Sequence, residues 1–418
     1  MTGRERVQAA LSHREPDQVP MDFGATAVTG IAASIVHKLR VALGLSTQNE
    51  SVRVVEPYQM LGEIGPDLRQ ALGIDTVGLT GTTLFGFENK DWKPWRLFDG
   101  TPVLVPGAFN TEPSADGSIL MYPEGDRTAP PSGRMPAGGY YFDTIVRQPP
   151  IIEGQLRVED NLEEFTPHSP EGLAAIGAGV SDLFGRTDLA LVAGLASLGL
   201  GDIALVPAPF LKHPKGIRDV EEWYVSTVTR REFVRQVFAR QCEIGIDNLK
   251  RAHEVVGDKI AVLFVTGTDF GTQRGPFISP ETYRDLYKPC HRRVNDWVHA
   301  HTKWRTFIHS CGGVEPLIAD FIEAGFDILN PVQCSAAGMD PEHLKRAYGS
   351  RITFWGGGVD TQKTLPFGTP AQVREEVRRR VGVFAEGGGF IFNAIHNIQA
   401  NTPVENVLAM LEAFAECR

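Results

Sequence analysis

Runs of apolar residues alternate with amphipathic stretches along the second half of this chain. The apolar runs are rich in β-branched residues and too short for helices, which predicts buried strands. They lie at residues 189–196, 259–265, 305–310, 326–332, 352–358 and 389–395, and a similar run lies earlier, at 74–81. Helical patterns follow them, most clearly at 280–304, 314–324, 340–347 and 369–386.

This alternation is typical of a parallel β-sheet whose buried strands are separated by helices. Seven or so strands predict an α/β fold, a (β/α)8 TIM barrel in which residues 1–418 form a single domain; an open doubly wound sheet is the alternative. Ser279 and Thr369 stand at N-cap positions of two of the helices, and Pro370 follows at a first helical position. The charged segment 1–20 predicts an N-terminal helical extension rather than a signal peptide.

Residues 83–150 break the alternation. The stretches LFDGTPVLVPG and DGSILMYPEGD place Asp-Gly turns between short apolar runs, which predicts β-hairpins. The segment also holds a group of aromatic residues, namely Trp92, Trp95, Tyr140, Tyr141 and Phe142. We expect an inserted antiparallel β cap. Its aromatic residues fit a lid over a small apolar substrate, and equally a core of the cap itself or a contact in a homodimer.

Polar residues follow several of the predicted strands. In a parallel barrel the carboxyl ends of the strands meet at one face, and catalysis takes place there. The stretches TGTDFGTQ, HSCGG, NPVQCS and AIHNIQ all fall at such ends. We therefore expect one rim to bring together Asp269, Gln273, His309, Cys311, Gln333 and His396.

His309 and Cys311 are two residues apart, so in an extended segment their side chains point the same way. An imidazole and a thiolate suit zinc, whereas the plainer interpretation is a buried cysteine beside a hydrogen-bonded histidine. The position at a strand end, before two glycines, favours the metal. A catalytic zinc usually takes three protein ligands, and His396 is the best third candidate. The alternative for His396 is a hydrogen bond to loop backbone.

The other polar residues at the strand ends are candidates for catalysis and for substrate binding. The candidate catalytic groups, as a general base, a substrate anchor or a partner of a ligand histidine, are Asp269, Gln273 and Asp360. Either aspartate could instead cap the helix that follows it. The candidate substrate contacts are Asp22, Gln333 and Trp355, and Gln333 is also a candidate for the fourth metal position.

Composition excludes several classes of partner. The 418 residues include 41 Lys and Arg against 51 Asp and Glu, a net charge of −10, and no basic run. Nucleic acid and anionic membranes are therefore poor partners. No stretch approaches the apolar length that spans a bilayer. The five cysteines are sparse and unpatterned, which suits a reducing cytoplasm and argues against a disulfide framework.

Three stretches carry a family resemblance: RERVQAALSHREPDQVPMDFG at the start, GTQRGPFISPETYRDLYKP in the centre and GGGFIFNAIHNIQANTPVENVLAMLEA near the end. Through them the chain resembles the uroporphyrinogen decarboxylase superfamily over nearly its whole length, which again implies a (β/α)8 barrel. True decarboxylases of that superfamily carry an R-Q-A-G-R motif that holds porphyrinogen carboxylates. The comparable stretch here, PMDFGATAVTG, lacks these arginines.

The corrinoid:thiol methyltransferases of the superfamily carry H-x-C at one strand end and a further Cys after a later strand, and they use zinc to activate a thiol. His309 and Cys311 match the first part, whereas His396 stands where the further Cys would fall and where decarboxylases commonly have His. The resemblance implies a zinc-dependent methyltransferase that moves a methyl group between a small methylated substrate or thiol and a corrinoid. The chain has no D-x-H-x-x-G corrinoid motif, so a separate protein would carry that cofactor. A decarboxylase-like enzyme and a non-catalytic tetrapyrrole-binding barrel are the alternatives.

Overall fold

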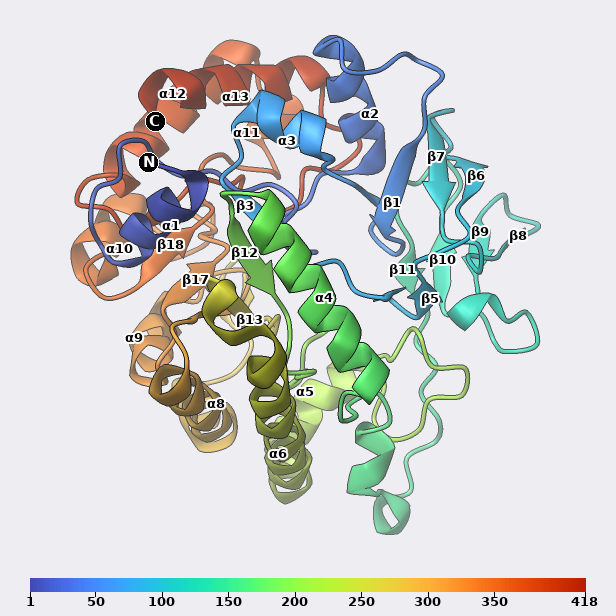
Figure 1. Ribbon diagram of the computed structural model, residues 1–418. Helices are drawn as coiled ribbons and strands as arrows, with labels where there is room; N and C mark the ends of the chain where they lie inside the picture. The colour runs from blue at the N-terminus through green and yellow to red at the C-terminus, as the bar shows by residue number, and fades with distance from the viewer.

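A curled sheet of seven parallel strands forms the centre of the computed structural model, which describes residues 1–418 (Figure 1). The order of the strands in space follows their order along the chain, as it does in a (β/α) barrel. The strands are β3 (Thr76–Gly78), β12 (Ala190–Ala193), β13 (Val262–Thr266), β16 (Arg305–His309), β17 (Ile328–Asn330), β18 (Thr353–Trp355) and β19 (Phe390–Ile391). Each is shorter than the predicted run that it matches, and all lie within that run except β13, which ends one residue beyond it.

Residues 20–22 bridge the two edge strands of this sheet. Met21 forms a parallel bridge with Phe392, directly after β19. The carbonyl of Met21 also accepts a hydrogen bond from the amide of Asp75, directly before β3, at 2.9 Å. An extended segment thus occupies the eighth position between β19 and β3. The molecule is therefore an α/β protein with a TIM-like sheet, as the sequence predicts.

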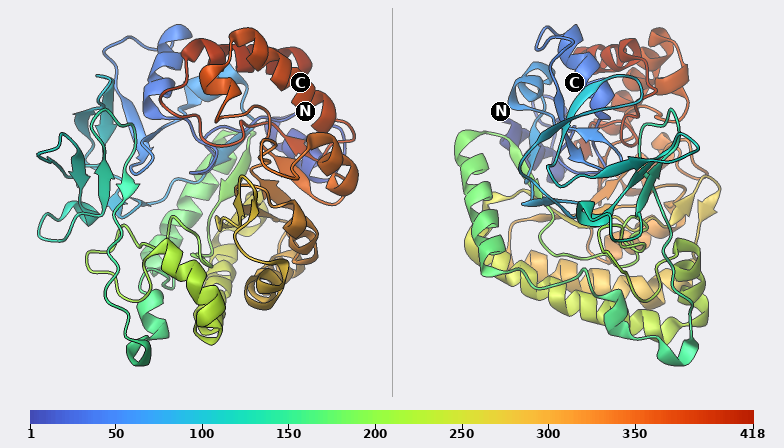
Figure 2. Two further views of the ribbon diagram at one scale, coloured as in Figure 1. Left: turned by 180° about the vertical axis from the view of Figure 1, so that it is seen from behind. Right: turned by 90° about the vertical axis from the view of Figure 1, so that its right-hand side faces the viewer.

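Helices surround this sheet (Figures 1 and 2). They are α1 (Gly3–Leu11), α2 (Ala33–Ala42), α3 (Pro66–Leu72), α4 (Pro170–Arg186), α5 (Val220–Thr229), α6 (Arg231–Val256), α7 (Pro280–Thr282), α8 (Lys288–His301), α9 (Glu315–Glu323), α10 (Pro341–Tyr348), α11 (Thr364–Phe367), α12 (Pro370–Phe384) and α13 (Val404–Cys417). Ser279 caps α7, and Thr369 forms a capping box with Gln372 at the start of α12. The helix predicted at 280–304 is interrupted by a π-helical turn at Tyr283–Tyr287. No helix is both long enough and apolar enough to cross a bilayer.

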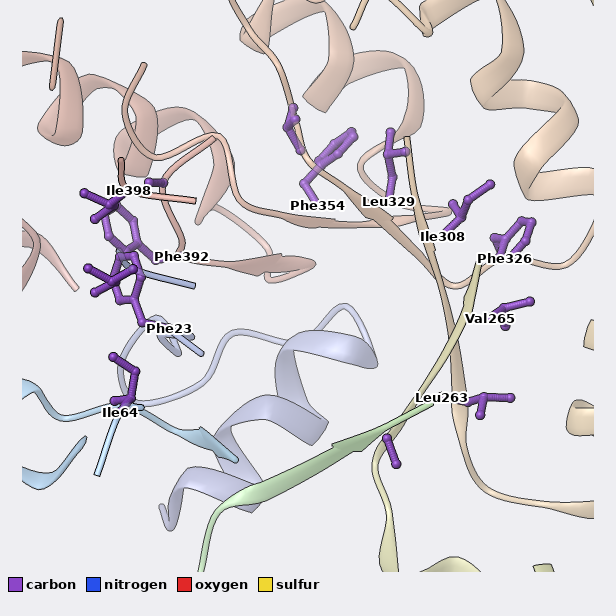
Figure 3. Packing of buried hydrophobic residues seen from close by; sticks show 14 of the residues in the cluster. Phe23, Ile64, Leu263, Val265, Ile308, Phe326, Leu329, Phe354, Phe392 and Ile398 are labelled. Carbon is purple, nitrogen blue, oxygen red and sulfur yellow. The ribbon is translucent and has the colours of Figure 1, made fainter. Parts of the chain in front are cut away.

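The side chains of the strands divide into an outer and an inner cluster, because successive residues of a strand point to opposite faces. The outer cluster, beneath the helices, includes Leu263, Ile308, Leu329 and Phe354 (Figure 3). The inner cluster includes Val262, Phe307, Ile328, Trp355 and Ile391, and these pack against Val7, Ala10 and Leu11 of α1. The amide of Gly389 donates to the carbonyl of Ala10 at 3.0 Å. Since Gly389 directly precedes β19, α1 lies at the amino end of the barrel.

Short strands fill the segment 83–150. A hairpin, β4 (Thr83–Leu84) and β5 (Phe87–Glu88), is followed by the antiparallel sheet of β8 (Thr111–Pro113), β9 (Ile119–Met121), β10 (Gly133–Met135) and β11 (Asp143–Thr144). A further sheet joins β6 (Lys93–Arg96) and β7 (Pro102–Val105) to β1 (Val52–Glu56) and β2 (Leu61–Gly62). The β-rich region beside the barrel, seen in the right view of Figure 2, therefore also includes strands that precede residue 83.

The aromatic residues of this region have two surroundings. The rings of Trp95 and Phe142 each pack against Phe109, with centroids 5.6 and 6.0 Å away, and so contribute to a core. Tyr140 and Tyr141 instead line a cavity together with Gln59 and with Gln399 and Asn401, which follow β19. One part of the aromatic group is thus packing, and another part faces the carboxyl end of the last strand.

Candidate metal centre

Three side chains converge at the carboxyl ends of β16 and β19. His309 is the last residue of β16, Cys311 follows it, and His396 lies in the turn after β19. One ligand atom of each lies within 4.8 Å of the other two. The Sγ atom of Cys311 is 3.3 Å from Nε2 of His309, and the two imidazole centroids are 5.3 Å apart. The structure thus brings together the three residues that the sequence predicts as metal ligands.

The alternation of β16 directs His309 to the inside of the barrel. Phe307 belongs to the inner cluster and Ile308 to the outer one, so His309 returns to the inside above Phe307. In the neighbouring strand β17 the residue opposite His309 is Asn330. Its side chain is fully buried and reaches the imidazole.

Asn330 fixes the tautomer of His309. The Nδ2 group of Asn330 donates to the carbonyl of Trp355 at 2.9 Å, which leaves its Oδ1 atom facing His309. The Nδ1–H group of His309 donates to this oxygen at 2.6 Å. The lone pair of Nε2 therefore faces Cys311, as a ligand imidazole requires. Asn330 was not predicted as a site residue, although it begins the stretch NPVQCS, which was assigned to a strand end.

The electrostatics of the cluster suit a metal ion. Burial lowers the pKa of His309 and that of His396 to about 4, so both imidazoles are neutral at neutral pH. Burial raises the pKa of the Cys311 thiol well above its usual value, and the carboxylates of Asp269 and Asp202 raise it further. A bound cation would supply the positive charge that a thiolate needs here. Two neutral imidazoles and one sulfur form a donor set that fits zinc.

Asp269 lies at the edge of the cluster. Its Oδ1 atom accepts a hydrogen bond from the amide of Cys311 at 2.6 Å and lies 3.8 Å from Nε2 of His309. Burial raises the pKa of this carboxyl. The hydroxyl of Tyr224 donates to the carbonyl of Asp269 and holds the loop after β13 in place.

A cavity of about 310 Å³ opens above the cluster. Cys311 and His396 line it, together with Gln273, Gln333 and Gln362. The oxygen of the Gln333 side chain accepts the amide of Gly312 at 2.7 Å. Gln273 is exposed, and its Nε2 group donates to Gln362 at 2.9 Å. Two of the predicted polar residues thus border the mouth of the site.

Three of the predicted site residues lie elsewhere. The carboxylate of Asp360 accepts the amides of Gln362 and Lys363 at 2.7 and 3.2 Å. It therefore holds the turn before α11 and does not cap that helix, which was its alternative role. Asp22 and Trp355, which we expected to contact substrate, are fully buried instead, with the indole N–H donating to Asp22 at 3.0 Å. Trp355 belongs to the inner cluster of the barrel, and Asp22 is held beside it by this hydrogen bond. Neither residue lines the cavity above the metal cluster.

Asp202 is a further carboxyl group near the cluster that was not predicted. Burial raises its pKa to about 7, and the nearby Asp269 contributes to that rise. It follows β12 in the stretch SLGLGD, so its signal was an acidic residue among glycines after a buried strand.

Comparisons with known proteins agree with this architecture. Residues 215–417 match the family model described as uroporphyrinogen decarboxylase (URO-D), and this stretch contains all three candidate ligands. Among solved structures, a methyltransferase from Methanosarcina mazei aligns over 100% of this chain and 99% of its own, with a TM-score of 0.54 and 17% sequence identity. A likeness at this identity shows the shared fold. No curated protein matches the chain.

Proposed function

We propose that the chain is a zinc-dependent methyltransferase of the uroporphyrinogen decarboxylase superfamily, whose family model matches residues 215–417. The observation that carries the proposal is the convergence of His309, Cys311 and His396, with their ligand atoms within 4.8 Å of one another. The three residues supply the protein ligands, and the fourth position is left to substrate, water or Gln333.

Zinc at this site would act as a Lewis acid that keeps a thiol ionised at neutral pH, or that stabilises the oxygen leaving a methoxylated substrate. The residues of the chain prepare the site for this chemistry. Asn330 holds the His309 ring, and Asp269 holds the Cys311 amide. We assign to Asp269 the acceptance of the proton that an entering thiol releases, because its carboxylate borders the cluster. We assign the substrate contacts to Gln273 and Gln333, which line the cavity.

The methyl group moves to or from a corrinoid that a separate protein carries. Two observations support this part of the proposal: the chain has no D-x-H-x-x-G motif, and the cavity above the cluster opens at the carboxyl end of the barrel. A carrier that docks at this rim brings its cofactor over His396 and Cys311. Such a docking surface is transient and of the order of 1,200 Å² or less in total.

The direct test is a methyl-transfer assay with the purified protein and a corrinoid protein loaded with methyl-corrinoid. We expect the corrinoid absorption spectrum to change when a thiol acceptor is added, and no transfer when the corrinoid protein is omitted. We also expect no coproporphyrinogen from uroporphyrinogen, because the stretch PMDFGATAVTG lacks the arginines that hold its carboxylates. Formation of coproporphyrinogen at a catalytic rate would contradict the proposal and favour a decarboxylase.

A further inference from the structure

A second cavity lies on the side of the barrel where β3 meets the segment after residue 22. Its volume is about 260 Å³, and sixteen residues line it. Most of them are glycines, small residues or apolar residues, including Val55, Leu61, Leu79, Leu84 and Phe85. The hairpin of β4 and β5 provides Leu84 and Phe85 and so forms one wall. The cavity is thus a small, largely apolar compartment.

Glu56, the last residue of β1, is the only ionisable group among these lining residues. Its side chain is 2% exposed. One carboxylate oxygen accepts the amide of Tyr58 at 3.0 Å, and the other accepts the amide of Gln59 at 2.5 Å. Burial raises the pKa of Glu56 to about 7, and no basic side chain contributes to offset that rise. A buried carboxyl group in an apolar cavity without a cationic partner lacks the counter-charge that such groups usually have.

We propose that this cavity binds a methylated ammonium group, with the carboxylate of Glu56 as its counter-charge. The apolar walls fit the methyl groups, and the ring of Phe85 adds the aromatic surface that quaternary ammonium ligands favour. The inference goes beyond the proposed function, because none of the residues that line this cavity lines the cavity above the metal cluster.

The cavity and the candidate metal centre share a structural support. Asn397 directly follows His396, and its Oδ1 atom accepts the amide of Gly30 at 2.6 Å. Its Nδ2 group donates to the carbonyl of Ala27 at 2.8 Å. Both Gly30 and Ala27 line the cavity. The turn that carries the third candidate ligand therefore also holds one wall of the cavity, which places the ammonium compartment on the His396 side of the barrel mouth.

The test is a binding measurement on metal-free protein, by calorimetry and ligand-observed NMR, with tetramethylammonium as the probe. tert-Butanol, a neutral molecule of similar shape, is the comparison ligand. Thr80 is exposed and lines the cavity, so Thr80→Trp fills it without disturbing the core. Thr82→Trp is the matched control, because Thr82 is also exposed and does not line the cavity.

We expect tetramethylammonium to bind and tert-butanol to bind at least about ten-fold more weakly, since a buried charge pair is lost. Thr80→Trp and Glu56→Gln should each weaken tetramethylammonium at least about ten-fold, and Thr82→Trp should not. Equal binding of the two ligands, or unchanged binding by Thr80→Trp, overturns the inference, even if Glu56→Gln fails to fold. The readout needs neither zinc nor methyl transfer, so this inference and the proposed function fail separately.

Discussion

Asn330 and the three candidate ligands together determine the geometry of the metal centre. The alternation along 305–310 predicts that His309 and Cys311 share a direction, because it depends only on the period of a strand. The contact between His309 and Asn330 depends on the register of β16 against β17, which one strand alone does not encode. The same limit explains Asp22 and Trp355. Both were predicted as substrate contacts, whereas the layer of the barrel to which Trp355 belongs buries them.

Replacement of Asn330 by alanine tests the role of this residue. The variant Asn330→Ala loses the acceptor for Nδ1 of His309, so the ring is no longer fixed. We expect zinc affinity to fall about 10–100-fold, as is usual when the partner of a ligand histidine is removed. Competition with a chromogenic chelator measures this. The control is Asn295→Ala, because Asn295 is also fully buried but bonds the carbonyl of Ala324. An equal loss of affinity in both variants would show that Asn330 acts only through stability.

His291 gives the protein a pH-dependent stability. It is fully buried, its Nδ1 atom lies 2.9 Å from the hydroxyl of Tyr283, and burial lowers its pKa to about 3. The folded-state pKa is below the unfolded value of about 6.5, so the unfolded state binds the proton first as pH falls. This contribution is fully present above about pH 6.5 and is lost as pH falls from there towards 3.

We therefore expect His291→Phe to flatten the dependence of unfolding free energy on pH between 6.5 and 3, by up to about 1.4 kcal/mol per pH unit. Urea unfolding of chelator-treated protein at several pH values measures the slope. Tyr283→Phe is the matched control, because it removes the same hydrogen bond and keeps the imidazole. If the two variants have the same slope, His291 is not the group responsible.

At the level of the elements, closure of the barrel depends on Asp75, directly before β3. Its side chain is 4% exposed and accepts Arg6 of α1 at 2.6 Å, Arg418 after α13 at 3.0 Å and the amide of Met21 at 2.9 Å. One carboxylate thus joins both termini to the eighth position of the barrel. The sequence predicts seven strands but not this position, because a single bridging residue has no periodicity to detect.

Removal of the negative charge at Asp75 should be costly. Asp75→Asn leaves Arg6 and Arg418 without their buried counter-charge, and we expect a loss of about 3–5 kcal/mol in unfolding free energy. The control is Asp17→Asn, which removes the charge from the other ion-pair partner of Arg6. The Asp17 side chain is 41% exposed, so this ion pair should contribute less than about 1 kcal/mol to the unfolding free energy. Denaturant unfolding compares the two. Similar losses would mean that the contacts of Asp75 do not close the barrel.

In the helices, features set by neighbouring residues were predicted, whereas a feature set by tertiary packing was not. Ser279 and Thr369 cap the helices that they were predicted to cap, because capping needs only neighbouring residues. The π-helical turn at Tyr283–Tyr287 was not predicted. It places Tyr283 and Tyr287 against Phe270, at centroid distances of 5.3 and 4.9 Å, and that packing is a tertiary effect.

For the whole molecule, the alternation of strands and helices was sufficient to predict the TIM-like sheet. The composition of 83–150 indicated β-structure, but not that β7 would pair with β1, because that parallel contact joins segments far apart in the sequence. The candidate metal centre likewise depends on contacts between segments that are far apart in the sequence. His309 and His396 are separated by most of the last quarter of the chain, and only closure of the barrel brings them together.

The proposed zinc site is tested by metal analysis of the purified protein and of two cysteine variants. We predict about one zinc per chain in the natural sequence. Cys311→Ala should lose this zinc while it remains folded, since a catalytic site contributes less to folding than a structural one. Cys334→Ala is the matched control and should retain the metal, because Cys334 follows the neighbouring strand and lies outside the cluster. Full retention of zinc by Cys311→Ala, or absence of zinc from the natural protein, would show that His309, Cys311 and His396 do not form a zinc site.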